Sequence, residues 1–190
     1  EAMRQPLEEG AVTVARASGT LHLPARFQLI CAMNPCRCGW RGHPTHRCTC
    51  SDRDVERYVE KISGPLLDRI DLHVNVPCVE YDAIRRRQPA ETSAAVRERV
   101  CAVQARRFQG TDIACNTQMT AAMIGQFCRL DSTGESLMRS AFDRMGLTAR
   151  SHDRILRVAR TIADLDGEEH ILPQHLAEAI QYRNTDILRG

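Results

Sequence analysis

Four cysteines in one short segment have the spacing with the clearest chemical meaning in this 190-residue sequence. They form two C-x-C pairs separated by nine residues: Cys36, Cys38, Cys48 and Cys50. Two tight pairs of thiolates on a short loop suit tetrahedral Zn²⁺. C-x-x-C is the more usual pair, so His43 or His46 in place of one thiol stays an open alternative, as do four reduced thiols without a metal. The spacing predicts a structural zinc site with no open coordination position.

Asn34 lies between this cysteine loop and an apolar run. The run FQLICAM, residues 27–33, has the composition of a buried strand. In parallel α/β sheets, the active crevice lies beyond the carboxyl ends of the strands. This position favours a chemical role for Asn34, and an ordinary turn before Pro35 is the alternative.

Three arginines also lie where their charge could act on a ligand. Arg69 stands between two acidic residues, Asp68 and Asp71, and on that pattern alone it predicts a surface ion pair of small energetic value. Arg150 and Arg154 lie one helical turn apart at the start of a periodic segment, where Arg150 could instead cap the start of a helix or lie in solvent beside it.

In the first half of the sequence, both strands and helices are expected to position these residues. Residues 12–16 alternate, SGT at 18–20 is a turn, and residues 71–77 alternate again, which predicts strands at these places. A helix is expected from an N-cap at Asp52, and a short one at 65–70.

The second half predicts helices only. Their expected ranges are 93–110, 120–130, 133–146, 151–165 and 173–183. The first should turn Val96, Val100 and Val103 inward. The fourth should bury one face, formed by Ile155, Val158, Ile162 and Leu165.

The predicted fold class is therefore α/β followed by all-α. The expected boundaries are an α/β part at 1–82, a linker at 83–90 with the arginine run 85–87, and a helical domain at 91–190. A net charge of +2 does not by itself indicate a nucleic-acid partner.

The remaining composition bears on the compartment. Nine cysteines are an odd number, and no apolar run has the length of a membrane span, which predicts a reducing cytoplasmic compartment and no membrane partner. The sequence opens without an initiator Met, and we expect it to be part of a longer chain.

Three ordered motifs resemble one family: FQLICAMNPCRCG, ISGPLLDRIDLHVNVP and LTARSHDRILRVARTIADL. They are similar to the C-terminal portion of the magnesium-chelatase-like AAA+ ATPases, in the YifB/ComM group of competence-associated helicases. The resemblance runs over nearly the whole sequence. It implies the C-terminal part of an AAA+ P-loop core followed by a helical lid.

The resemblance also implies a function. Such proteins are ATP-driven homo-oligomeric rings, here expected to be hexameric and to act on DNA, that use ATP and Mg²⁺ at sites shared between subunits. By this resemblance Asn34 matches sensor 1, Arg69 the arginine finger and Arg150 sensor 2, with Arg154 as the competing sensor 2 residue. Arg is suited to the finger role because its charged donor fork matches phosphoryl oxygens.

The sequence departs from the family pattern in one respect. It contains neither a G-x-x-x-x-G-K-[ST] loop nor an apolar run ending in paired acids, so we expect the chain alone neither to bind ATP tightly nor to hydrolyse it. DNA contact is expected at the hairpin, through Arg16 and Arg26.

Two other functions compete with the DNA motor. One is a magnesium-chelatase subunit, and the other is a non-catalytic zinc-bearing interaction module. The cysteine loop favours the helicase group of the family.

Overall fold

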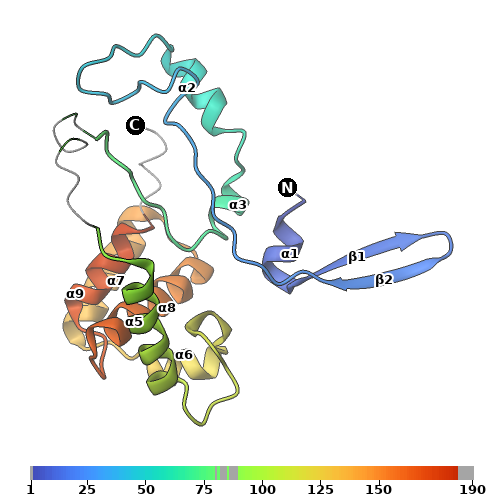
Figure 1. Ribbon diagram of the computed structural model, residues 1–190, viewed down its shortest axis with the longest axis vertical. Coiled ribbons are helices and arrows are strands. Elements are labelled where there is room, and N and C mark those ends of the chain that lie inside the picture. Colours follow the sequence, from blue (N-terminus) through green and yellow to red (C-terminus); the bar gives the residue numbers. More distant parts are fainter. Residues whose placement is uncertain (1, 80, 82–84, 86–89, 184–190) are drawn as a thin grey trace. The chain divides into compact units, whose positions relative to one another are not determined.

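The computed structural model describes residues 2–79, 81, 85 and 90–183. It divides into two compact units, within residues 1–73 and 74–184 (Figure 1). The first unit is mixed α/β with one small sheet, and the second is helical. Of the linker predicted at 83–90, residues 83–84 and 86–89 lie outside the described part, and these include the last two arginines of the run 85–87.

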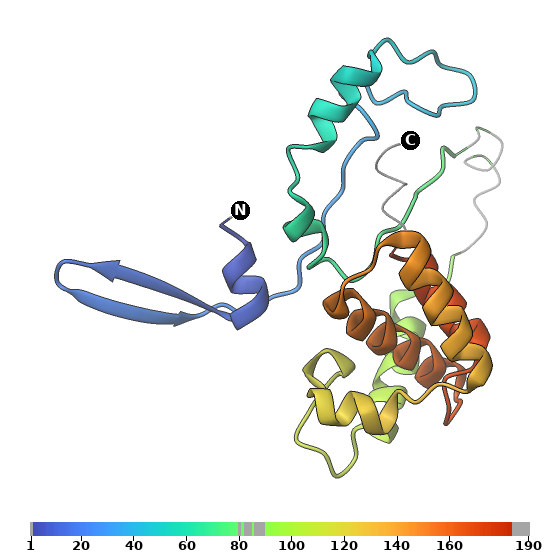
Figure 2. The same ribbon diagram turned by 180° about the vertical axis from the view of Figure 1, so that it is seen from behind.

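The first unit opens with a short helix and a β-hairpin. Helix α1 spans Arg4–Glu9 and ends at Gly10, whose left-handed φ of 62° turns the chain into the first strand. Strands β1 (Ala11–Arg16) and β2 (Gly19–Pro24) pair antiparallel and lie side by side in Figures 1 and 2. This confirms the hairpin that alternation and the SGT turn predict.

The strand predicted at residues 27–33 is absent, and so is the one at 71–77. Both segments are irregular, and their apolar side chains are exposed: Ile30 is 83% exposed and Val76 is 81% exposed. A strand needs a neighbour to satisfy its N–H and C=O groups. Within the described residues, β1 and β2 pair only with each other, so neither segment has one.

Two helices follow the cysteine loop. Helix α2 spans Asp52–Val59, and its N-cap is Ser51, one residue before the predicted cap. The Ser51 hydroxyl accepts a hydrogen bond from the Asp54 N–H at 3.2 Å, while the Asp54 carboxylate accepts from the Ser51 backbone N–H at 3.3 Å. This reciprocal pair satisfies two backbone donors, which explains why Ser51 and not Asp52 is the N-cap of the helix. Helix α3 is a single turn at Gly64–Leu67.

The second unit contains five α-helices and one 3₁₀ turn in its described part. Their bounds are α5 (Ser93–Arg107), η1 (Asn116–Gln118), α6 (Ala121–Phe127), α7 (Ser132–Met145), α8 (Ala149–Asp166) and α9 (Pro173–Gln181). Side chains cap the N-termini of four of these helices. The hydroxyls of Thr92, Thr120 and Thr148 cap three of them, and the carboxylate of Asp131 caps the fourth. All five predicted helices are confirmed.

The core of this unit forms where α8 packs against α9, η1 and α6. It is aliphatic and sulfur-rich, as expected from a sequence with only 4% aromatic residues. Its most buried members include Met119, Met138, Ile155, Leu156, Ala159, Ala163 and Leu176. The small alanines let the neighbouring helices approach closely.

Two predicted faces are wrong in detail. Val96 and Val100 on α5 are exposed, because α5 contacts the core through its last turn, where Arg106 donates to the carbonyl of Asp164 at 2.9 Å. On α8 the buried face is formed by Ile155, Ala159 and Ala163, and Leu165 is exposed. Alanine contributes little hydrophobicity to a periodic pattern. The buried face formed by Ala159 and Ala163 could therefore not be recognised from the sequence.

Helices long and apolar enough to cross a membrane do not occur in the described residues. None of the nine cysteines, all of which are described, forms a disulfide.

Candidate functional site

The four cysteines of the loop come together at one point. The Sγ atoms of Cys36, Cys38, Cys48 and Cys50 all lie within 4.8 Å of one another. Cys36 is buried, and its Sγ lies 3.3 Å from that of Cys38 and 3.7 Å from that of Cys48. Four sulfurs gathered in this way can surround one tetrahedral ion without rearrangement of the chain.

The electrostatics of this cluster are unequal. Backbone N–H groups of Trp40 and Thr49 lower the pKa of the Cys38 thiol to about 5. For Cys48, a hydrogen bond from the backbone N–H of Cys50 lowers the pKa of the thiol. Desolvation and the neighbouring thiols outweigh this bond and raise the pKa to about 11. Thiolates this close repel one another, so without a cation the cluster keeps part of its protons. A divalent ion would replace them, which is the chemistry that fits this donor set.

Glycines let the loop bend around the sulfurs. Gly39 and Gly42 have φ of 83° and 74°, a left-handed conformation that other residues adopt at a cost. The Gly39 N–H donates to the carbonyl of Cys36 at 3.0 Å, which closes the turn between the first two thiols.

The two histidines of the loop are directed elsewhere. Nδ1 of His43 accepts from the backbone N–H groups of Thr45, at 3.2 Å, and of His46, at 3.1 Å. The imidazole of His46 stacks on Trp40, with ring centroids 4.1 Å apart and 12° between the planes. The cluster of potential ligands therefore consists of the four thiols, and the geometry favours these over a histidine as the fourth ligand.

Asn34 is exposed and lies at the entrance to the cysteine loop. Its side chain faces Gly39, because a Cβ placed on Gly39 would be 3.8 Å from the Asn34 Nδ2. The asparagine therefore lies against the Gly39 turn of the cysteine loop.

Arg69 is buried, at 9% exposure, and points into its own unit. Its Nη1 donates to the carbonyl of Pro65 at 2.5 Å, and its Nη2 lies 2.7 Å from Oε1 of Glu8 on α1. The described ion pair joins Arg69 to a residue far away in the sequence, which the acidic neighbours of Arg69 do not predict. A role at a ligand requires that the guanidinium leave Glu8.

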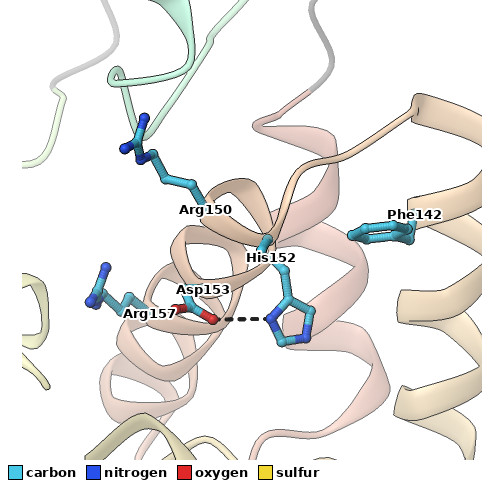
Figure 3. A pocket seen from close by; sticks show the side chains of 6 residues that line it. Phe142, Arg150, His152, Asp153 and Arg157 are labelled. Atoms are coloured by element: carbon cyan, nitrogen blue, oxygen red, sulfur yellow. Dashed lines mark hydrogen bonds and ion pairs between the residues drawn. The ribbon is translucent and has the colours of Figure 1, made fainter. Parts of the chain in front are cut away.

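A shallow cleft of about 520 Å³ lies beside the start of α8 in the helical unit (Figure 3). Its lining combines aromatic, cationic and His–Asp groups: Phe142, Ala149, Arg150, His152, Asp153 and Arg157. Arg150 is exposed and extends away from Phe142, whereas His152 pairs with Asp153 at 3.1 Å. Arg154 is half-buried and does not line the cleft. Such a lining suits an anionic ligand with an aromatic part.

Arg16 and Arg26 are exposed but separate. Arg16 ends β1 beside the hairpin turn, and Arg26 lies beyond the end of β2. A Cβ on Gly10 would be 3.2 Å from Cγ of Arg26, so this side chain lies against the base of the hairpin. The structure therefore does not bring the two arginines to one surface of the hairpin.

A buried polar cluster in the helical unit escaped the sequence analysis. Asp164 accepts from Nε of Arg160 at 3.0 Å and from Nδ2 of Asn116 at 2.9 Å, and it pairs with Arg107 at 3.3 Å. An Arg–Asp pair at i, i+4 within an apolar helix face is the signal that could have revealed it.

The comparisons with known proteins cover both units. Residues 1–84 match the family of magnesium chelatase, subunit ChlI, and residues 90–183 match the C-terminal family of the same subunit. The chain is 40% identical over 185 residues to competence protein ComM of Haemophilus influenzae, which covers 96% of the chain and 36% of that protein. It is 38% identical over 189 residues to the uncharacterized protein YifB of Escherichia coli, covering 99% of the chain and 37% of YifB. The chain thus spans little more than a third of these relatives.

Proposed function

The chain belongs to the magnesium chelatase ChlI family, and from that premise we propose that it completes the nucleotide site of an ATP-driven DNA motor. The motor is a competence-associated AAA+ helicase that uses ATP and Mg²⁺ and assembles as a homo-oligomeric, hexameric ring. Likeness to a competence protein over 96% of the chain supports this reading. The observation that carries it is the exposed Arg150 in a cationic and aromatic cleft, at the position that the family resemblance assigns to nucleotide sensing.

Arg150 acts as sensor 2 in this proposal. It is exposed and lines the cleft, whereas Arg154 does not, and the cleft offers Phe142 to an aromatic ring and guanidinium groups to phosphates. Arg150→Ala should therefore reduce the ATP turnover of the full gene product more than Arg154→Ala does.

Asn34 and Arg69 act in the chemical step. Asn34 orients the water that attacks the γ-phosphate, and Arg69 stabilises the charge that develops on the phosphoryl oxygens of the neighbouring subunit's nucleotide. The Arg69 guanidinium must leave Glu8 to do so. The guanidinium of Arg69 would then exchange the carboxylate of Glu8 for a phosphate, so it has an anionic partner both before and after the exchange.

The thiol cluster holds a structural Zn²⁺ in this proposal. The four sulfurs fit the ion in number, spacing and charge, and they leave no position for substrate. The ion supplies a rigid junction. The residues of the loop then fix the backbone beside Asn34.

DNA is the proposed partner, and Arg16 is its contact on the hairpin. Arg16 is exposed beside the turn, where phosphate contacts would be salt-dependent and independent of sequence. Arg26 lies against Gly10 and contributes less.

ATP turnover by the full gene product that contains this chain tests the proposal, with and without single-stranded or branched DNA. Turnover should rise with DNA and fall about 10³-fold or more in Arg69→Ala. Because Arg69 is buried, Arg69→Lys is the second variant, since it keeps the charge beside Glu8 but loses the donor fork. Arg57→Ala, on the exposed side of α2, is the matched control and should keep its turnover.

Turnover that ignores DNA would contradict the motor, and turnover indifferent to both Arg69 variants would contradict the finger. The chain alone should show no turnover, because its sequence holds neither phosphate-binding loop nor Walker B acids.

A magnesium-chelatase subunit is the second candidate, favoured by the description of the matching family. DNA-independent turnover together with stimulation by a porphyrin-metallating partner would select it.

A further inference from the structure

Three rings gather on the outer side of the cysteine loop. The indole of Trp40 stacks on the imidazole of His46, and His43 meets both rings edge-on, with centroids 5.0 Å from Trp40 and 4.6 Å from His46. Trp40 is nevertheless 41% exposed. A large, flat ring is thus held by its neighbours while much of its surface stays open to solvent.

The loop segment that carries this stack is basic in sequence, and the nearest acidic residues along the chain are Asp52 and Asp54, just after the loop. Residues 35–50 contain Arg37, Arg41 and Arg47 and no Asp or Glu. Arg41 is engaged with Asp52 at 2.8 Å, whereas Arg37 and Arg47 are exposed. Thiolates bound to a divalent ion would add negative charge, but Cys36 is buried and Cys38 accepts backbone N–H groups, whereas Arg37 and Arg47 are exposed. An anionic partner therefore meets the guanidinium groups first.

The loop is also ordered before any partner arrives. The backbone N–H of Trp40 donates a hydrogen bond to the sulfur of Cys38. The residue that carries the indole ring is therefore bonded directly to the sulfur cluster through its backbone. The immobilisation cost that a free loop pays on binding is already met by these contacts.

We propose that the Trp40–His46 stack is a base-stacking platform for single-stranded nucleic acid, with Arg37 and Arg47 contacting the phosphates. An open aromatic face beside cationic side chains is the arrangement that holds unstacked bases without regard to sequence. The inference deepens the proposed function, since it names a second contact for its DNA. It stands on the loop geometry and not on the nucleotide site.

Trp40 is the only tryptophan of the chain, so its fluorescence reports on this loop alone. The probe is an oligothymidylate of about ten nucleotides, added to the zinc-loaded chain. Its control is an oligomer of equal length with abasic sites throughout, which has the same phosphates and no bases. Quenching by oligothymidylate and not by the abasic oligomer is the expected result. Equal quenching by both, or none by either, would overturn the stacking role.

Variants measured by anisotropy of a labelled oligothymidylate give a second readout. Trp40→Ala should weaken binding about 5- to 100-fold, and Trp40→Phe should restore most of it. Tyr81→Ala, which removes an exposed ring outside the loop, should leave binding unchanged. Arg47→Gln should reduce the slope of log affinity against log salt by about 0.7. Each variant must retain one zinc per chain, so that loss of binding is not loss of the loop.

Oligouridylate in the same assay distinguishes RNA from DNA as the source of the bases. Quenching of Trp40 fluorescence by oligothymidylate, together with ATP turnover that ignores DNA, would support the stacking platform and contradict the DNA motor. ATP turnover that rises with DNA, without any quenching, would support the motor and contradict the platform. Unchanged affinity in Trp40→Ala would end the proposal.

Discussion

The helical unit and the cysteine loop are ordered by different means. In the helical unit, side chains from five elements bury one another, and Ile155 and Leu176 have no exposed surface. The loop has no regular secondary structure, and its buried residue is Cys36, held by sulfur neighbours. The first kind of order is spread over many contacts, whereas the second depends on four atoms. The two regions should therefore respond to different perturbations, and five predictions test that contrast.

The largest effect is expected from Cys36→Ser. Removal of one of four thiolates should reduce bound zinc from one ion per chain to none, because structural zinc derives its affinity from the complete ligand set. Helical circular dichroism should stay near that of the unaltered chain. Cys78→Ser, an exposed cysteine outside the loop, is the control and should keep its zinc. Stoichiometric zinc in Cys36→Ser, measured by atomic absorption, would refute the site.

Asp164→Ala is the strongest perturbation of the helical unit. It leaves the buried guanidinium of Arg160 and the amide of Asn116 without their carboxylate, a loss of about 3–5 kcal/mol in unfolding free energy. Urea denaturation followed at 222 nm measures it, while zinc content should not change. Asp143→Ala, on the exposed side of α7, should lie close to the parent. Equal stability of the two variants would mean that the polar cluster contributes nothing.

A smaller effect is expected from Ile155→Val. Loss of one buried methylene next to Ala159 should cost about 1 kcal/mol, and zinc binding should again be unaffected. Leu165→Val removes the same group from an exposed side chain on the same helix and should cost less. A reversed order in denaturation midpoints would show that α8 packs through the other face.

The smallest effect is a count of protons and needs no substitution. Four ordinary thiols would release about four protons when zinc binds at pH 7. Since the pKa of Cys38 is lowered to about 5, that thiol is already ionised, whereas the pKa of Cys48 is raised to about 11 and that thiol must lose its proton. Calorimetry in buffers of different ionisation enthalpy should therefore give fewer than four protons per ion.

The sign of the pH dependence follows from the same groups. Protons compete with the metal for the thiolates, so zinc affinity should fall as the pH falls from 8 toward 5. The last thiol to take up a proton should be Cys38, because its pKa is the one lowered to about 5. Affinity that rises on acidification would contradict a thiolate site.

Local patterns explain what the sequence predicted well. Caps such as Asp131, the left-handed Gly146 and the periodicity of α7 are properties of neighbouring residues, so the helices could be located from sequence. The cysteine spacing is equally local. Strand formation at residues 27–33 is not, because it depends on a partner elsewhere, and composition alone does not supply that partner.

The details of the site were harder to predict for a related reason. Nothing in the residues around Arg69 indicates that its guanidinium meets Glu8 on α1. Likewise, the spacing of His43 and His46 is compatible with metal binding, and the thiols are favoured only by what the fold shows: the four sulfurs gather at one point, and the His46 ring stacks on Trp40. Side-chain direction and contacts distant in sequence lie outside what spacing can show.

The cysteine loop has a consequence for the order in which the chain is made. All its sulfurs lie within residues 36–50, so closing this ring requires only a short stretch of polypeptide. The helical core, in contrast, joins Met119 to Ala179 and is complete only when α9 has left the ribosome. Synthesis proceeds from the N-terminus, and the metal can therefore be captured while the helices are still being translated. A metal ion that binds these four sulfurs would then act on the nascent chain before the helical unit is complete.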